Sequence, residues 1–195
     1  MSLGFNGRST YADFVPYIRY TAMGERGGVW SDRDHDDIVF LALCDLEQIR
    51  SGWLLFETGL PPDLHWDEVL GQPGPRPGKG HRRGICLRMF FPEPDIGLRE
   101  LTTNNAGLCA AIDKIYSEFE FAPQRAQGLV PLVEVVSITP SETNFGTVFD
   151  SEFAIIDWQP RPRELTPPPP SKPPPTPTLP GLPAVRNDLD DDIPF

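Results

Sequence analysis

Proline sets the limit of what this chain can fold. Half of its 24 prolines lie between Pro160 and Pro183. Proline fixes φ and lacks a backbone N–H, so such a run favours an extended polyproline segment over a helix or a sheet. We therefore expect four parts: a flexible lead-in over residues 1–12, one folded domain over 13–163, a Pro-rich disordered linker over 164–186 and a terminal segment over 187–195.

The charge of the chain restricts its nucleic-acid chemistry. The chain has 17 Lys and Arg residues against 28 Asp and Glu residues, a formal net charge of −11. Residues 1–160 alone hold 23 acids and 13 bases, so the terminal segment is not the main source of the negative charge. This balance excludes a broad basic surface. Any contact with nucleic acid must use a local basic strip.

One segment reverses this balance. Residues 76–88 contain no acid and five bases, namely Arg76, Lys79, Arg82, Arg83 and Arg88. Basic side chains gathered within an acidic chain indicate phosphate contact, with a solvated loop as the alternative.

Alternating residues predict two strands with mixed basic and aromatic faces. Over residues 84–91, Ile85, Leu87, Met89 and Phe91 fall on one face, and Cys86, Arg88 and Phe90 on the other. Over residues 14–22, Tyr17 and Arg19 share a face. Such a face suits nucleic acid, because the guanidinium meets phosphate and the ring stacks on a base. The alternative for Phe90 is a place in the core.

The remaining elements predict a mainly β domain. Leu108, Ile112, Ile115, Tyr116 and Phe119 recur at helical spacing and predict a helix over residues 106–120. Further strands are expected over 29–30, 38–46, 49–57, 129–138 and 153–158, with long loops at 58–83 and 139–146. This order favours an OB-fold-like five-stranded Greek-key barrel with one inserted helix, and a β-sandwich with one helix fits nearly as well.

Several other site types have little support. Cys44, Cys86 and Cys109 lie apart among apolar residues, which predicts free thiols in a reducing cytoplasm. The loop over 31–37 carries His35 and several aspartates, but Asx-rich turns look the same, so we expect no metal and no cofactor. No apolar run is long enough to span a membrane.

The last six residues are suited to binding another protein. They are Asp190, Asp191, Asp192, Ile193, Pro194 and Phe195. A pocket that takes the terminal ring, with basic residues around it for the carboxylates, would recognise them. The alternative is an acidic tail that only aids solubility.

This terminal segment resembles the C-terminal tip of bacterial single-stranded DNA-binding proteins, which ends in acidic residues followed by Ile-Pro-Phe. The body is similar to bacteriophage-encoded single-stranded DNA-binding proteins with an OB-fold. That second likeness rests on Val15-Pro16-Tyr17, Gly52-Trp53 and the stretch from Ile156 to Pro162.

The resemblance implies sequence-independent binding of single-stranded DNA in replication, recombination or repair, in the cytoplasm of a bacterial cell. The tip would then recruit replication and repair proteins, and a homodimer stays open. The residues expected at the DNA are Tyr17, Arg19, Trp30, Trp53, Lys79, Arg82, Arg83, Arg88 and Phe90. Trp53 and Trp158 are equally suited to the core.

Two other classes of protein stay open. An interaction adaptor that does not bind DNA would still use the tip and the proline tract, and the negative body favours it. A metal-dependent nuclease would need clustered carboxylates, for which only the Asp34–Asp37 loop is a candidate. We therefore expect a binding protein and not an enzyme.

Overall fold

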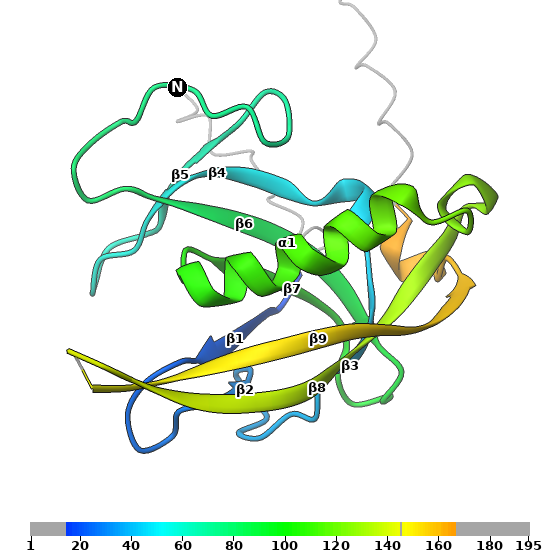
Figure 1. Cartoon of the computed structure of the whole chain (residues 1–195), viewed down its shortest axis with the longest axis horizontal. Helices are drawn as coiled ribbons and strands as arrows, with labels where there is room; N and C mark the ends of the chain where they lie inside the picture. The colour runs from blue at the N-terminus through cyan, green and yellow to red at the C-terminus, as the bar shows by residue number, and fades with distance from the viewer. Residues whose placement is uncertain (1–14, 145, 167–195) are drawn as a thin grey trace, which may run out of the picture.

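The computed structural model describes residues 15–144 and 146–166. The lead-in over 1–12, the linker from residue 167 onward and the six-residue tip lie outside the described residues. The described part is mainly β with one α-helix, as the sequence predicts (Figure 1). Its strands are β1 (Tyr17–Thr21), β2 (Val29–Ser31), β3 (Leu41–Cys44), β4 (Arg50–Leu55), β5 (Asp63–Trp66), β6 (Arg82–Phe91), β7 (Gly97–Thr103), β8 (Leu129–Thr143) and β9 (Gly146–Pro160).

The strands form one mixed sheet, and β6 is its centre. The pairing order is β2-β1-β7-β6-β3-β8-β9, while β4 pairs with β6 and with β5. β7 pairs with β6 over the whole stretch from Ile85 to Phe91. β3 and β4 each pair with a different part of β6, through Leu43↔Phe90 and Arg50↔Cys86. β4 therefore pairs with the first half of β6, and β3 pairs with residues near its end.

The far end of the sheet curls back toward its beginning. β8 and β9 form a long antiparallel hairpin, and β1 runs parallel to β7. An isolated bridge joins Met23, just after β1, to Val148 in β9. The backbone N–H of Phe149 also donates to the carbonyl oxygen of Ala22 at 2.8 Å. These bonds bring β9 beside the end of β1, so the open sheet is strongly curved.

Helix α1 (Ala106–Phe121) covers the concave side of this sheet (Figure 1). The Asn105 side chain accepts a hydrogen bond from the backbone N–H of Leu108 at 2.8 Å and caps the helix N-terminus. The face predicted to be buried, with Leu108, Ile112, Ile115 and Phe119, lies in the main core. That core also holds the apolar face of β6, namely Leu87, Met89 and Phe91.

Several predicted boundaries are wrong in an informative way. β5 lies within the segment expected to be a loop at 58–83, and β7 was not expected at all. β8 and β9 continue through the loop expected at 139–146, because their backbones pair from Thr139↔Asp150 to Thr143↔Gly146 at the end of the hairpin. The apolar run at 38–46 contains only the short β3 and then a 3-10 turn over Leu46–Gln48.

A buried ion pair joins the loop after β2 to β7. The Nε of Arg99 donates to a carboxylate oxygen of Asp32 at 2.8 Å, and their side chains are 9% and 2% exposed. Burial raises the pKa of Asp32, but hydrogen bonds from the backbone of Asp34 and His35 and from Arg99 outweigh it and lower the pKa to about 2. This carboxylate therefore organises the acidic loop from inside.

The packed body continues beyond the domain end expected at residue 163. A short 3-10 helix, Arg163–Leu165, places Leu165 in a second small core with Leu43, Val130 and Leu132. All three cysteines are free, with Cys44 and Cys86 buried and Cys109 partly exposed. Among the described residues, no helix has the length and apolar character needed to cross a membrane.

Candidate nucleic-acid interface

The strand register divides the predicted DNA-binding residues between two faces of the sheet. Residues directly opposite each other on paired strands point to the same face, and alternate residues along a strand point to opposite faces. Arg83 therefore shares its face with Ile85, Leu87 and Met89, toward helix α1. Arg82 and Arg88 point the other way. We call these the helix-side face and the outer face.

The outer face gathers four arginines from three strands. On β6 it carries Arg82 and Arg88; Arg50 of β4 lies opposite Cys86. Tyr17 of β1 and Arg88 both lie opposite Glu100 of β7, so Tyr17, Glu100 and Arg88 form a row across three strands. Arg19 follows Tyr17 at the alternate position. The outer-face positions of β1, β4, β6 and β7 thus contain Arg19, Arg50, Arg82 and Arg88, with Glu100 as their one acid.

The guanidinium groups on this face keep unbonded nitrogens. Arg88 uses its Nε to donate to Glu100 at 3.2 Å, and its terminal nitrogens bond no described residue. Arg50 donates one bond, to Cys86 Sγ at 3.3 Å, and Arg19 bonds Ser31 through Nε at 3.0 Å. Arg82 is exposed and forms no ion pair with any described residue. Each arginine can therefore still donate to a phosphate.

A small hollow lies between two of these arginines. It has a volume of about 230 Å³ and is lined by Gln48, Arg50, Cys86 and Arg88. Trp66 of β5 lies opposite Gly52, and the Arg50 guanidinium stands 4.6 Å from the Trp66 ring centroid. Two guanidinium groups around one polar hollow, with an aromatic ring beside them, suit a phosphate and its neighbouring base.

The predicted aromatics have different fates. Tyr17 is 52% exposed on the outer face. Trp30 is 2% exposed and packs in the core against Tyr20, Phe40 and Phe153, so the prediction that it stacks on DNA is wrong. Phe90 lies on the outer face, as the alternation predicts, but packs against the second core. Trp158 stacks on Phe119 and belongs with the main core.

Trp53 and Arg83 lie on the helix-side face, within a projecting lobe made of β4, β5 and residues 67–81. The Trp53 ring has the guanidinium groups of Arg83 and Arg76 at 5.3 and 5.6 Å, and its Nε1 donates to the carbonyl oxygen of Gly74 at 2.9 Å. It borders a hollow of about 580 Å³ that the Pro-rich loop lines. Trp53 therefore holds this loop against the sheet.

Arg83 is bound within the lobe by a buried acid. Its Nη1 donates to Asp67 at 2.8 Å, its Nη2 contacts the second carboxylate oxygen, and Ser51 donates to the same carboxylate. The hydrogen bond from Arg83 lowers the pKa of Asp67, which stays ionised and neutralises the arginine. Arg83 is thus separated from the outer-face arginines.

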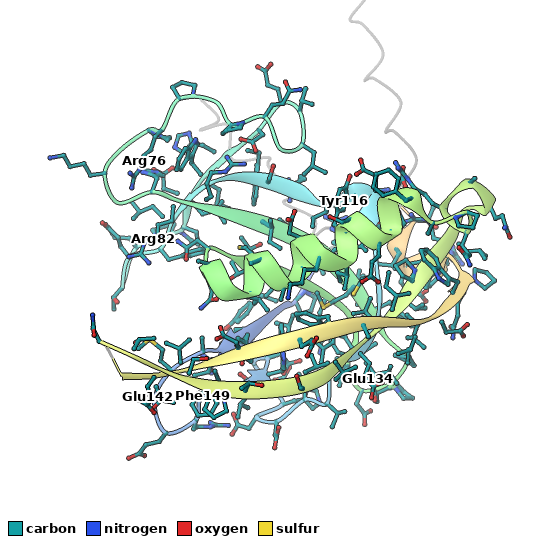
Figure 2. The ribbon with its side chains drawn as sticks, in the orientation of Figure 1. Arg76, Arg82, Tyr116, Glu134, Glu142 and Phe149 are labelled. Atoms are coloured by element: carbon teal, nitrogen blue, oxygen red, sulfur yellow. The ribbon has the colours of Figure 1, made fainter. Side chains whose placement is uncertain are left out.

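The lobe exposes other bases of the predicted strip. Lys79 is exposed and forms no ion pair with any described residue. Figure 2 shows Arg76 on the loop and Arg82 at the start of β6, on the same side of the lobe. The acidic residues Glu134 and Glu142, labelled in the same figure, lie along β8. The bases of residues 76–82 are therefore set at one edge of the acidic body.

Two residues of this interface were missed from the sequence. They are Arg50, two residues before Gly52 on β4, and Trp66, which pairs with Gly52 from β5. A Cβ on Gly52 would lie 2.4 Å from the carbonyl oxygen of His65. Glycine at this position allows β4 and β5 to approach. Arg50 lies within the strand predicted over 49–57, so its place on a strand face could have been predicted from the alternation of residues. Trp66 lies in the segment predicted to be a loop, where no strand pattern was visible.

Known proteins add no evidence about this site. Comparisons of the chain with protein-family models, with curated proteins and with solved structures give no match.

Proposed function

We propose that this protein binds single-stranded DNA, or a similar flexible polyanion, across its outer face. The observation that carries the proposal is four arginines on one face of a chain with net charge −11, beside an exposed tyrosine. An acidic protein has no general attraction to phosphate, so a local cluster of unpaired guanidinium nitrogens calls for an anionic ligand. Tyr17 and Trp66 would stack on bases without reading their sequence.

The strand pairing supports an OB-fold variant as the framework of this site. If β3 and β4 are taken as one bent strand along β6, the chain has five principal strands in the order β3/β4, β6, β7, β8, β9. Helix α1 then lies between the third and fourth. The first of these pairs with β6 and β8, and β8 pairs with β9. β1 departs from a five-stranded barrel by pairing with both β7 and β2, and residue Met23, just after β1, bridges to β9.

In this framework the outer face of β6 and β7 is the binding surface, with the lobe at one end. Lys79 is exposed on the loop of the lobe and would extend the path of the bases beyond the strands, whereas Arg76 stands over the Trp53 ring on the helix-side face. The terminal segment from Asp190 to Phe195 would recruit partner proteins of replication or repair.

The test is a fluorescence-anisotropy titration of a labelled oligo-dT against a duplex of equal length, at two salt concentrations. We expect preferential binding to the single strand. With four arginines on phosphate, log K should fall with log salt with a slope of about −3. Arg50→Ala should weaken binding and make that slope shallower, whereas Arg33→Ala, an exposed arginine of the β2–β3 loop, should change neither.

The net negative charge of the body favours the alternative, an adaptor that does not bind DNA. An adaptor would bind no oligonucleotide at low salt, even after removal of residues 187–195. That result would contradict the proposal and leave a protein that acts through its terminal segment.

A further inference from the structure

Three ligand-type side chains meet in the lobe, on its helix-side face. Asp63 and His65 are alternate residues of β5 and share a face, while His81 directly precedes β6. His65 Nε2 lies 2.9 Å from one carboxylate oxygen of Asp63, and His81 Nε2 lies 2.9 Å from the other. One potential ligand atom from each residue lies within 4.8 Å of the other two. Two imidazoles are thus directed at a single carboxylate.

His81 is the buried member of this cluster. Its side chain is 8% exposed, and its Nδ1 is buried with no hydrogen-bond partner among the described residues. The two ring nitrogens of an imidazole point in different directions, so Nδ1 is not directed at Asp63, and Nε2 is the His81 atom that would bind an ion at the cluster. His65 and Asp63 are about half exposed, so the cluster is closed on the His81 side and open to solvent on the other.

The ligand set selects the kind of ion. Two imidazole nitrogens and one carboxylate oxygen suit zinc and its neighbours among the transition metals, whereas magnesium and calcium prefer oxygen ligands only. Three protein ligands leave one position of a tetrahedral ion for water on the open side. No cysteine belongs to the cluster, so its ligands do not oxidise to a disulfide.

We propose that Asp63, His65 and His81 bind one zinc-like divalent transition-metal ion, which fastens the two ends of the Pro-rich loop at 67–80 to each other. His65 and His81 flank this loop, and a bond between them through the ion closes it. Trp53 pairs with His65 across β4 and β5, so the ion lies beside the ring that holds the same loop. The inference does not depend on DNA binding.

The experiment uses the full chain without a histidine tag, stripped with a chelator and then titrated with Zn²⁺ by calorimetry. We expect one ion per chain, a higher thermal unfolding midpoint with Zn²⁺ and a change in tryptophan fluorescence. Mg²⁺ should reproduce none of these. Co²⁺ should bind at the same stoichiometry and give the visible absorption of a four-coordinate site.

His65→Ala is the decisive variant, because His65 is half exposed and its loss leaves the fold intact. It should weaken Zn²⁺ binding at least as much as the loss of an outer-shell partner, which is about 10- to 100-fold. His35→Ala is the matched control, since His35 also bonds an aspartate, Asp32, but lies outside the cluster. Its Zn²⁺ affinity should equal that of the unmodified chain.

Two results would overturn the proposal. The first is no binding of Zn²⁺ to the stripped chain, in which case the two histidines and Asp63 form a hydrogen-bonded cluster only. The second is unchanged affinity in His65→Ala, which would place the ion elsewhere. A loss in His35→Ala alone would assign the ion to the acidic loop at 31–37.

Discussion

Arg83 donates two hydrogen bonds to the carboxylate of Asp67, whose side chain is only 2% exposed. The preceding residue, Arg82, is exposed on the outer face and forms no ion pair with any described residue. Two adjacent arginines in one basic segment therefore have different roles. Arg83 joins β6 to the end of β5, and Arg82 remains available to a ligand.

This difference predicts opposite effects of two neighbouring substitutions. Arg82→Ala should weaken single-stranded DNA binding and make the salt slope shallower by about 1, with unchanged stability. Arg83→Ala leaves the Asp67 carboxylate buried without its main partner and should cost about 2 kcal/mol of unfolding free energy. Urea unfolding and anisotropy on both variants check this, and a stable Arg83→Ala protein with lost DNA affinity would contradict it.

The aromatic residues yield a second pair of substitutions. Tyr17→Ala removes an exposed ring from the outer face and should weaken binding by about 1–3 kcal/mol without affecting folding. Tyr17→Phe keeps the ring and should bind almost normally. Trp30→Ala opens a cavity among Tyr20, Phe40 and Phe153 and should destabilise the fold by about 3–5 kcal/mol. Equal DNA affinity in Tyr17→Ala and the unmodified chain would exclude Tyr17 from the interface.

The buried Asp32 predicts how stability depends on acid. Its pKa is lowered to about 2 in the folded protein from its ordinary value of 3.8. A depressed pKa stabilises the fold above the unfolded value, and this stabilisation is lost as the pH falls from about 4 to about 2. The loss should be about 2 kcal/mol, measured by urea unfolding across this range.

Asp32→Asn tests the assignment of that acid-sensitive step. The variant should be less stable near neutral pH, because Arg99 then lies buried without a carboxylate, and its stability should fall less between pH 4 and pH 2. Asp37→Asn is the control, because Asp37 is exposed in the same loop. An unchanged acid profile in Asp32→Asn would assign the step to another carboxylate.

The sequence predicted some elements well, because the spacing of apolar residues within one helix or strand shows which of its faces is buried. Leu108, Ile112, Ile115 and Phe119 marked the buried face of α1, and alternation separated the two faces of β6. The pattern failed for β7, where Arg99 points into the core. Its partner Asp32 lies 67 residues earlier, and no periodicity in β7 contains that information.

The candidate site was predictable in composition and not in arrangement. The basic segment at 76–88 was visible, but the same alternation that placed Arg88 outward also places Arg83 inward, toward Asp67. Arg50 and Trp66 joined the outer face only through strand pairing. The meeting of Asp63, His65 and His81 likewise depends on β4 lying between β5 and β6.

The terminal segment gives the last prediction, which follows from charge alone. Asp190, Asp191 and Asp192 carry the same charge as phosphate, and a proline tract of many residues connects them to the body. If they compete with DNA for the outer-face arginines, removal of residues 187–195 should tighten oligo-dT binding at low salt. The gain should vanish at high salt, because screening shortens from about 10 Å at 0.1 M to about 3 Å at 1 M.

A full-length variant with all three aspartates changed to asparagine separates charge from chain length. It should bind DNA as tightly as the truncated chain at low salt, since only the competing charge is lost. Phe195→Ala keeps the aspartates and should leave DNA affinity unchanged while removing the ring that a partner protein would bind. Equal affinities in the unmodified, truncated and asparagine chains would show that the terminal segment does not compete for the arginines.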